Sequence, residues 1–421
     1  MRVLWFTNIP LPPLLVHWGQ KATGSGWWMQ SLAEDLVSSG AITRLGIVYA
    51  GPGCTDECLE LGGIDFFTVA QSRLVAVTGL GVQAEEKRTF RQFNRIVERY
   101  RPDLIHIHGT ERSYGAIKSR LGVRVPVIVS LQGLMGECAR YAWGDKTFRD
   151  VLKLVNGWEL IHNFPTLRQR ARFARQAQLE KRIIASVDAV LGRTQWDRSY
   201  SRAIAPNVPY FHVDEMLRSE FYRAVWSLHG ARHFRLYTTA RLNFLKGMHV
   251  LLEAVALLRR EFAGLEVRVA GGMDPSPACA FMTQMTADLG IKDAVVFLGW
   301  LPPGRIVEEL LSAHCYVNTS FIENSSNSIQ EAMLLGCPCV AAFTGGNPSL
   351  IDHRLSGLLV PNGCAHLFAD VIREVLMDDL LCQTIGANAR ARGIVRNDRT
   401  AILHQLLAAY CHFVGPKRIT I

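Results

Sequence analysis

The sequence predicts an α/β protein with parallel sheets, arranged as two Rossmann-like domains. Short apolar runs alternate with segments of helical periodicity along all 421 residues. These runs are β-branched or aliphatic, and they are too short for helices of typical length. The alternation lapses between residues 207 and 233. We therefore expect an N-terminal domain over residues 1–215 and a C-terminal domain over residues 230–395.

Twelve of the apolar runs are predicted strands, six in each half of the chain. The first six are Val3–Thr7, Leu45–Tyr49, Asp65–Val69, Leu104–His108, Val127–Leu131 and Ala189–Leu191. The second six are Leu236–Ala240, Val267–Ala270, Val295–Leu298, Cys315–Thr319, Cys339–Ala342 and Leu358–Val360. Helical segments fill the gaps between them. A last helix over residues 400–415 has no strand after it, and we expect it to pack back on the N-terminal domain.

The charge of the chain is mildly positive and unevenly distributed. Lys and Arg number 46 against 37 Asp and Glu, which gives a formal net charge of +9. Residues 1–229 contain 29 basic and 21 acidic residues, so the excess lies in the first half. A positively charged half of the chain suits an anionic partner, for example a membrane surface or a phosphorylated substrate. The chain shows no nucleic-acid-binding module, and we expect no nucleic-acid partner.

Cysteine usage and the apolar segments predict a cytoplasmic protein. The ten cysteines form no CxxC pair and no Cys/His quartet with zinc spacing, as expected of reduced thiols. The apolar N-terminus is interrupted by Asn8, Pro10, Pro12 and Pro13, so it is a poor signal peptide. No run approaches 18 apolar residues. We expect a protein that is free in the cytoplasm or lies on the inner face of the cytoplasmic membrane.

The strongest local motif is a polar loop and helix start that follow the predicted strand Cys315–Thr319. Glu323 lies in the loop and Glu331 in the helix, with seven residues between them. The two carboxylates should stand about 7–10 Å apart, which suits two hydroxyl-bearing ends of one elongated ligand. The helix N-terminus between them favours an anion such as phosphate. The alternative is a solvated acid and a helix-terminal glutamate.

Two cations follow the first strand of the second half. Arg241 and Lys246 stand where they could neutralise a diphosphate without a metal ion. The alternative is two surface cations on a loop. The chain contains no Asp-x-Asp, the element through which a metal-dependent sugar transferase usually holds its donor. We therefore expect no metal site and no cofactor.

A glycine loop opens a helix after the first strand. Its residues Gly24, Ser25 and Gly26 are small enough to let a phosphate approach the backbone. Met29 stands where the dinucleotide fingerprint GxGxxG has its last glycine, so that fingerprint is incomplete. The alternative is an ordinary tight turn.

Together the motifs resemble those of glycosyl transferases group 1, the retaining family 4 glycosyltransferases of the GT-B fold. In that fold two Rossmann-like domains face each other across a cleft. Glu323 and Glu331 match the family's E-x7-E motif. Arg241, Lys246 and Gly247 match its Arg-x4-Lys-Gly element.

The resemblance is strong over residues 235–362, where Gly345-Gly346 and Gly357-Leu-Leu-Val also match. The loop sequence Asn-Ser-Ser-Asn-Ser after Glu323 is similar to that of members from bacterial surface-polysaccharide clusters. The same is true of Gly192-Arg-Thr-Gln-Trp-Asp-Arg.

The resemblance implies a role for each matched residue. Glu323 would contact hydroxyls of the transferred sugar, and Glu331 would contact the ribose of the nucleotide. Arg241 and Lys246 would hold the diphosphate and stabilise it as it leaves. Glu323, Arg241 and Lys246 are the implied catalytic residues.

Further donor contacts are implied at four places. Backbone N–H groups of Asn327 and Ser328 would assist at the diphosphate. The loop Gly24–Gly26 would approach it from the other domain. The main chain at Leu301 would meet the base.

Three residues are candidates for the acceptor side. Many family members have a histidine after the strand that matches Val127–Leu131, and here Gln132 stands in its place. An amide can bond a sugar hydroxyl but cannot act as a base. His108 and Glu111 follow another strand and are candidates for acceptor contact, although a structural role suits His108 equally.

The basic segment Arg168–Arg182 could dock on anionic lipid or on a lipid-diphosphate acceptor. The alternative is a solvated helix face.

The implied function is that of a retaining hexosyl- or related transferase. It would move a sugar from a nucleotide-diphosphate donor, such as a UDP-sugar, to a glycan or lipid-linked acceptor in surface polysaccharide biosynthesis. The nucleotide sugar is a co-substrate in this interpretation. Two alternatives are a tandem-Rossmann NAD(P)-dependent oxidoreductase and a non-catalytic protein that binds nucleotide sugars.

Overall fold

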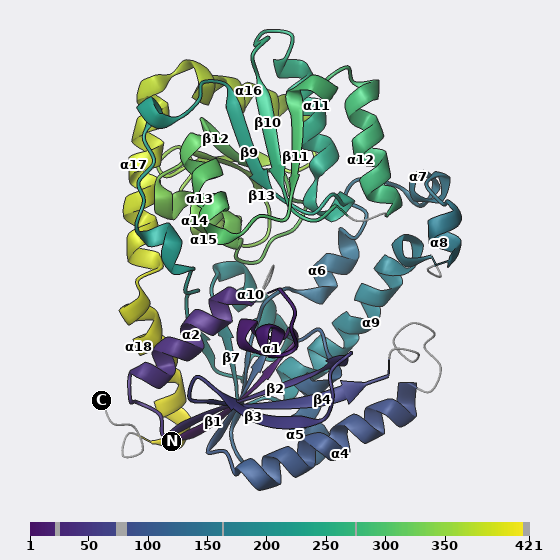
Figure 1. Cartoon of the computed structure of the whole chain (residues 1–421), viewed down its shortest axis with the longest axis vertical. Helices are drawn as coiled ribbons and strands as arrows, with labels where there is room; N and C mark the ends of the chain where they lie inside the picture. Colours follow the sequence, from purple (N-terminus) through teal and green to yellow (C-terminus); the bar gives the residue numbers. More distant parts are fainter. Residues whose placement is uncertain (22–25, 73–81, 162–163, 274–275, 416–421) are drawn as a thin grey trace.

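The chain folds around two separate β-sheets, one above the other in Figure 1. The computed structural model describes residues 1–21, 26–72, 82–161, 164–273 and 276–415. The strand order is β3-β4-β2-β1-β5-β6-β7-β8 in the first sheet and β11-β10-β9-β12-β13-β14 in the second. All neighbouring strands are parallel except β3 and β4. The predicted fold class, two parallel-sheet α/β domains, is confirmed.

The first sheet lies within residues 2–212. Its strands are β1 (Arg2–Thr7), β2 (Arg44–Pro52), β3 (Glu57–Leu61), β4 (Ile64–Gln71), β5 (Leu104–His108), β6 (Val127–Ser130), β7 (Ala189–Gly192) and β8 (Tyr210–His212). Its helices are α1 (Pro12–His17), α2 (Trp27–Ser38), α4 (Val82–Tyr100), α5 (Ile117–Leu121), α6 (Met135–Arg140), α7 (Phe148–Lys153), α8 (Gly157–Ile161), α9 (Pro165–Ser186) and α10 (Gln195–Ile204).

The second sheet lies within residues 235–361. Its strands are β9 (Arg235–Thr239), β10 (Glu266–Ala270), β11 (Val295–Gly299), β12 (Cys315–Asn318), β13 (Cys339–Phe343) and β14 (Leu358–Pro361). Its helices are α11 (Met248–Leu258), α12 (Pro277–Asp288), α13 (Pro303–Ser312), α14 (Asn327–Leu335), α15 (Asn347–Leu350), α16 (Ala365–Met377) and α17 (Asp379–Arg396). The last helix, α18 (Arg399–Val414), follows directly.

The prediction of six strands is confirmed for the second half and wrong for the first, where the described residues form eight. The two additional strands, β3 and β8, both lie at edges of the sheet. In β3, the only antiparallel strand of the described sheets, partly buried and exposed residues alternate, and β8 has only three residues. Neither forms the continuous apolar run that marks a buried parallel strand.

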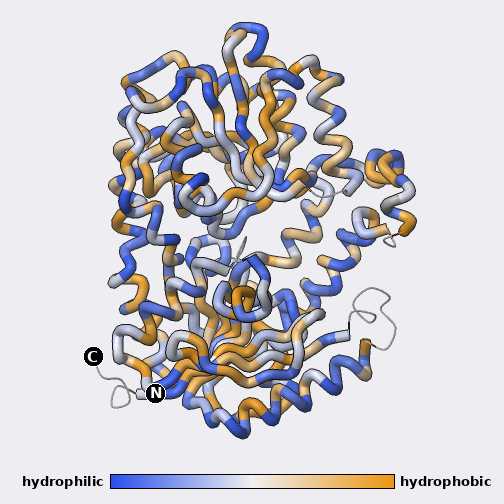
Figure 2. Tube along the Cα trace, in the orientation of Figure 1, coloured by the Kyte–Doolittle hydropathy of each residue, from blue (hydrophilic) through white to orange (hydrophobic). Residues whose placement is uncertain are grey.

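Each sheet carries apolar side chains on both faces. In β1, Val3 and Trp5 contribute to one core cluster while Leu4 and Phe6 contribute to the other. Helices α2 and α18 cover the first of these faces, and α4 and α9 cover the second. The hydropathy colouring in Figure 2 shows the strands of both sheets as mainly hydrophobic. This double burial explains why most of the strands are recognisable as short apolar runs.

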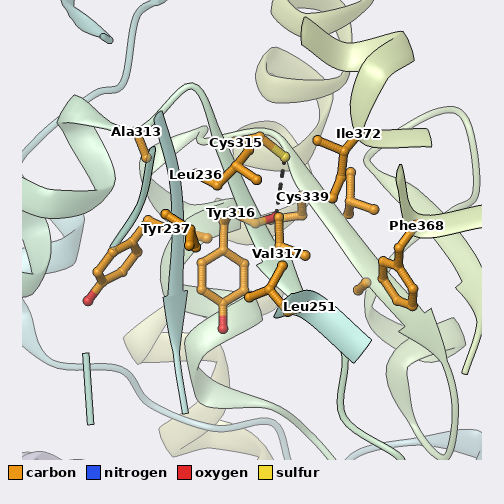
Figure 3. Close-up of a cluster of buried hydrophobic side chains, with 14 of the residues drawn as sticks. Leu236, Tyr237, Leu251, Ala313, Cys315, Tyr316, Val317, Cys339, Phe368 and Ile372 are labelled. Carbon is orange, nitrogen blue, oxygen red and sulfur yellow. Dashed lines mark hydrogen bonds between the residues drawn. The ribbon is translucent and has the colours of Figure 1, made fainter. Parts of the chain in front are cut away.

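The core of the second sheet forms one continuous cluster. Figure 3 shows its centre, where Tyr237 of β9 and Tyr316 of β12 lie among aliphatic side chains. The buried cysteines of the chain are Cys279, Cys315, Cys337, Cys339 and Cys382, and all ten cysteines are free thiols. Burial raises the pKa of the thiols at Cys315, Cys337 and Cys339, which keeps them protonated.

The strand orders place a switch point in each sheet. In the first sheet the chain starts at β1, builds β2 to β4 on one side, and then crosses to β5 on the other. In the second it starts at β9, builds β10 and β11, and crosses to β12. Loops that leave neighbouring strands in opposite directions open a crevice at the carboxyl edge of a parallel sheet. The two switch points therefore predict where a ligand site should lie.

The last helix returns to the first sheet. Helix α17 packs on α14 and α16 of the second sheet, whereas α18 contacts α2, β5 and β8 of the first. In Figure 1 these two helices run along one edge of the molecule, past both sheets. Tyr410 of α18 is fully buried, and its hydroxyl accepts a hydrogen bond from Trp5 Nε1 at 3.0 Å. The same hydroxyl lies 2.8 Å from His106 Nδ1.

We predict that Tyr410→Phe destabilises the protein by about 1–3 kcal/mol, because it leaves a buried indole N–H and a buried imidazole nitrogen without partners. The change should appear as a lower midpoint of urea unfolding. Tyr141→Phe is the control, since the Tyr141 hydroxyl makes no hydrogen bond within the described residues. Equal midpoints for the Tyr410 variant and the wild type would contradict the role assigned to this contact.

Candidate active site

A pocket of about 460 Å³ lies between the carboxyl edges of the two sheets. Residues from both sheets line it. From the first sheet come Gly26, Trp27, Trp28, Gln132 and Arg193, and from the second come Thr239, Lys246, Ala270, Gly271, Trp300, Leu301, Ile306, Glu323, Ser325, Ser326, Asn327, Ser328 and Glu331. Glu215, Leu217 and Arg218, from the segment that joins the two sheets, complete the lining. The pocket is where the two switch points predict a ligand.

Lys246 and Glu323 form an ion pair at the pocket. The Lys246 Nζ atom lies 2.5 Å from Glu323 Oε1, and the Ser320 hydroxyl donates to the same oxygen at 2.7 Å. The two side chains are 30% and 12% exposed, so the ammonium group remains accessible from the pocket. Lys246 ends a short 3-10 helix, η4 (Phe244–Lys246), which Asn243 caps by accepting from the Lys246 N–H at 3.0 Å.

Two glycine positions bring the backbone close enough to form this pair. At Gly247, with φ of +63°, a Cβ atom would stand 1.9 Å from the Thr319 carbonyl oxygen. At Gly346 a Cβ atom would stand 1.7 Å from the Asn324 carbonyl oxygen. The Gly346 N–H donates to the Glu323 carbonyl oxygen at 2.9 Å. The Gly247 approach holds the Lys246 loop against Thr319, just after β12, and the Gly346 approach holds the Glu323 loop against the turn after β13.

The N-terminus of α14 opens into the pocket. Ser326 is the N-cap residue, but its side chain makes no capping hydrogen bond. Ser325, Ser326, Asn327 and Ser328 all line the pocket. The first N–H groups of a helix have no acceptor within the helix, and the helix dipole adds positive potential there. The geometry therefore suits an anion beside Lys246.

Glu331 is held by an arginine that the sequence analysis did not single out. Arg218 Nε donates to Glu331 Oε1 at 3.0 Å, and Nη2 contacts the same oxygen. The Glu331 side chain is only 7% exposed. Burial raises the pKa of Glu331, while Arg218 acts in the opposite direction. Glu323 and Glu331 thus lie on one pocket wall and pair with different cations.

A third ion pair comes from the other side of the pocket. Arg193 Nη1, just after β7, lies 3.0 Å from Glu215 Oε2, and both side chains are less than 10% exposed. The Arg193 guanidinium carbon lies 5.1 Å from the centroid of the Trp28 ring. Burial raises the pKa of Glu215, and the Arg193 charge lowers it. Arg193 brings a cation from the first sheet to the pocket lining.

Arg241 and Leu301 lie around Trp300. Leu301 and Trp300 line the pocket directly after β11. Arg241 is exposed and lies beside the lining, with its guanidinium carbon 5.8 Å from the Trp300 ring centroid. Of the two cations in the Arg-x4-Lys element, Lys246 faces the pocket and Arg241 lies next to it.

Of the glycine loop, only Gly26 can be placed. Gly24 and Ser25 lie outside the described residues. Gly26 lines the pocket and is the N-cap of α2, with a φ of +106° that favours glycine.

Gln132 faces the pocket from the first sheet. Asn8 donates to its Oε1 atom at 3.0 Å, and Asn324 donates to its backbone oxygen at 3.2 Å. The Gln132 Nε2 atom is buried and has no hydrogen-bond partner among the described residues. Asn8 also donates to Glu111 Oε2 at 3.4 Å. Burial raises the pKa of the Glu111 carboxyl group to about 7, and the nearby Glu180 also raises it.

His108 is not among the residues that line the pocket. It is 1% exposed, and its ring centroid lies 4.5 Å from that of Trp5 and 4.0 Å from that of His106. Burial lowers the pKa of His108 far below the usual value, with further lowering by His106. The structure therefore gives His108 a place in the core of the first sheet.

Arg193, Glu215 and Arg218 are the charged pocket residues that sequence reasoning missed. Glu215 and Arg218 lie where the strand and helix pattern lapses, and nothing in their spacing indicates a site. Arg193 lies in Gly192-Arg-Thr-Gln-Trp-Asp-Arg, a segment noted for its resemblance alone. Within the described ranges, no three His, Cys, Asp or Glu side chains are grouped so that they could hold a metal ion.

Two family models together match most of the chain. The glycosyl transferase 4-like domain matches residues 23–213, and glycosyl transferases group 1 matches residues 229–392. The chain belongs to the glycosyl transferases group 1 family. The resemblance found in the sequence is thereby confirmed.

Curated relatives of this family member match part of the chain and not its whole length. The D-inositol 3-phosphate glycosyltransferase of Corynebacterium urealyticum is 34% identical over 145 residues, which is 33% of this chain and 34% of that protein. The amylovoran biosynthesis glycosyltransferase AmsK of Erwinia amylovora is 28% identical over 164 residues, 38% of this chain and 40% of that protein. The matched stretches thus span about a third to two fifths of each relative.

Solved structures match over the full length. Sucrose-phosphate synthase from Thermosynechococcus elongatus has a TM-score of 0.77 at 17% identity and covers 98% of both chains. HepE from Anabaena, solved in complex with UDP, has a TM-score of 0.69 at 18% identity and covers 98% of this chain and 100% of that one. At these identities the likeness establishes the fold, which is GT-B as predicted.

We predict that Arg218→Leu destabilises this family member by about 3–5 kcal/mol, because it leaves the Glu331 carboxylate buried without a counter-charge. The variant Arg218→Leu/Glu331→Gln should recover part of the loss, since the amide carries no charge. A double-mutant cycle from denaturant unfolding measures this coupling. Additive effects of the two substitutions would contradict a coupled pair.

A second prediction concerns pH. The pKa of Glu111 is raised in the folded protein to about 7, so the folded state binds a proton that the unfolded state has already released. The stabilisation that comes from protonating Glu111 in the folded state is therefore present at low pH and is lost as the pH rises to about 7. Over this range the free energy of unfolding falls by at most about 1.4 kcal/mol per pH unit. Glu111→Gln should flatten this part of the stability profile. An unchanged slope between about pH 4.5 and pH 7 would contradict the raised pKa.

Proposed function

We propose that this chain is a retaining glycosyltransferase that moves a sugar from a nucleotide-diphosphate donor to a glycan or lipid-linked acceptor. The observation that carries the proposal is the pocket between the two carboxyl edges, where Lys246 lies beside the open N-terminus of α14. A diphosphate needs a cation and converging N–H groups, and this corner supplies both. We propose that the transfer needs neither a metal ion nor a cofactor.

The donor would rearrange the ion pair at this corner. A bound diphosphate competes with Glu323 for the Lys246 ammonium group, because both are anions within its reach. Once released, the Glu323 carboxylate can accept hydrogen bonds from hydroxyls of the transferred sugar. Glu331, held by Arg218 through Oε1, would accept a hydrogen bond from the ribose through its other oxygen. Leu301 would meet the base.

The chemical step would leave the anomeric configuration unchanged. The bond between the anomeric carbon and the diphosphate oxygen breaks, and its electron pair stays on the diphosphate. Lys246 and the N-terminal amides of α14 stabilise that charge as it develops, with Arg241 beside them. The acceptor oxygen bonds to the anomeric carbon on the same face, and its proton passes to the departing phosphate. Gln132 bonds a hydroxyl in this scheme and takes no proton.

The relatives suggest the biological setting. AmsK is named for amylovoran biosynthesis, which favours a role in surface polysaccharide assembly. HepE was solved with UDP and with UDP-glucose, which favours a UDP-sugar as the donor here. We propose a cytoplasmic enzyme that uses such a donor. None of the described helices is long and apolar enough to cross a membrane.

The oxidoreductase alternative has less support. A dinucleotide fingerprint needs a small residue at the position of Met29, where the helix approaches the strand. Met29 is instead fully buried and forms part of the core between α2 and the sheet. A non-catalytic protein would also bind the nucleotide sugar, so this alternative differs from our proposal only in that no sugar is transferred.

The first experiment is a thermal-shift screen of UDP, GDP, ADP and NAD, with and without EDTA. A ligand at a hundred times its Kd stabilises by about 2.7 kcal/mol. We expect a shift with UDP that survives EDTA. A shift with NAD alone would favour the oxidoreductase, and donor binding without turnover would favour the non-catalytic protein.

A second experiment tests whether the anomeric configuration is retained. The configuration of the product is read by NMR, and an inverted product would refute the proposed retention.

We predict that Lys246→Ala lowers kcat/KM by about 10²–10³, because it removes a preorganised charge from the departing diphosphate. The measurement is the initial rate of nucleotide release with the donor identified by the screen. Lys292→Ala, an exposed lysine outside the pocket, is the control and should keep the wild-type rate. An unchanged kcat/KM for the Lys246 variant would refute the assigned diphosphate site.

A further inference from the structure

Helices α7 and α8 form a projection whose exposed side chains are unusually apolar. Phe148 and Leu152 of α7 are 55% and 49% exposed, and Leu160 and Ile161 of α8 are 61% and 81% exposed. In Figure 1 the two helices stand out from one edge of the molecule, and Figure 2 shows hydrophobic residues on them. Four large exposed apolar side chains within 14 residues of chain, 148–161, make the projection a candidate interaction surface.

The neighbouring helix α9 has a basic face. Arg168, Arg172, Arg175 and Arg182 are spaced by three, four or seven residues, so they lie along one side of the helix. All four are exposed, and none forms an ion pair within the described part of the chain. The one acidic residue of α9, Glu180, is buried and accepts from Thr110 and Tyr200, so it does not neutralise this face.

The projection and α9 are in direct contact. Trp143 donates from Nε1 to the Thr166 carbonyl oxygen of α9 at 2.9 Å, and its ring centroid lies 6.1 Å from that of Phe148. The Arg170 guanidinium carbon lies 5.9 Å from the Trp143 ring. Arg149 and Lys153 add two exposed cations on α7 itself. Trp143 therefore joins Phe148 of the projection to the N-terminal end of α9, and the basic face begins there with Arg168, two residues after Thr166.

The projection is connected along the chain to the pocket residue Gln132. Gln132 lines the pocket, and the chain then runs through α6 directly into the projection. The connecting segment contacts helix α11 of the second domain, because His249 Nε2 lies 2.9 Å from Asp145 Oδ1. A Cβ atom at Gly144 would stand 2.7 Å from the Phe244 carbonyl oxygen. These contacts hold the base of the projection against the second domain, on the chain segment that follows the pocket residue Gln132.

We propose that the α7–α8 projection and the basic face of α9 dock on an anionic lipid bilayer. Large apolar side chains beside unpaired cations match the boundary between acyl chains and anionic headgroups. A protein partner would need matched acidic residues, whereas a bilayer needs only negative surface charge. This proposal goes beyond the glycosyl transfer and does not depend on the sugar or the base of the donor.

The test is flotation of the purified full chain with vesicles of phosphatidylcholine alone and of phosphatidylcholine mixed with phosphatidylglycerol. We expect flotation with the mixed vesicles only, and its loss when salt is raised from about 0.1 M to about 1 M. Absence of binding to the mixed vesicles, or equal binding to both kinds, would overturn the proposal.

Two sets of variants locate the surface. Arg168→Glu/Arg172→Glu/Arg175→Glu should weaken binding about tenfold or more, and Ile161→Ser alone should weaken it measurably. The charge control is Arg91→Glu/Arg95→Glu/Arg99→Glu, three exposed arginines on α4, and the apolar control is Val395→Ser, 77% exposed on α17. Both controls should float like the wild type.

Each variant must keep the wild-type melting temperature, and Ile161→Ser remains informative if the triple variant does not fold. Loss of flotation in the controls, or none in the α9 variant, would refute this placement.

Discussion

The pocket is organised by charge pairing. Each cation in the described lining has one carboxylate partner: Lys246 has Glu323, Arg218 has Glu331, and Arg193 has Glu215. In a partly buried site an unpaired charge is costly, so the ligand-free pocket must neutralise its own cations. The pairs also keep the cations extended and in place. An anionic ligand then replaces carboxylates that are already present, and it does not have to gather flexible side chains.

The three pairs differ in what an incoming ligand can displace. Lys246 is 30% exposed, whereas Arg218 and Arg193 are 16% and 8% exposed. The more open pair is the one at the N-terminus of α14, where the phosphates are proposed to bind. The two closed pairs join the linking segment to the two sheets, because Glu215 and Arg218 both come from residues between β8 and β9. They therefore hold the pocket walls together.

The sequence predicted the fold class, the second sheet and several of the residues that line the pocket on the side of the second sheet. These features depend on local patterns: buried parallel strands are short apolar runs, and Glu323, Lys246 and the α14 residues follow strands directly. Edge strand β3 was not predictable in this way, since half-exposed strands lack a continuous apolar run. Arg218 and Glu215 were missed because their importance comes from long-range pairing, which no local pattern encodes. The burial of His108 has the same origin, because it depends on Trp5 and His106 across the sheet.

The return of α18 to the first sheet has a consequence for how the protein is made. Ile402, Leu406 and Tyr410 are fully buried in the same core as Val3 and Trp5. On a ribosome, which releases the chain from its N-terminus, the first sheet emerges roughly 200 residues before the helix that completes one of its faces. The second domain can finish folding while the first still has an uncovered apolar surface. The domain that is made first therefore completes its core only after the second domain has been made, and removal of α18 would impair the N-terminal core.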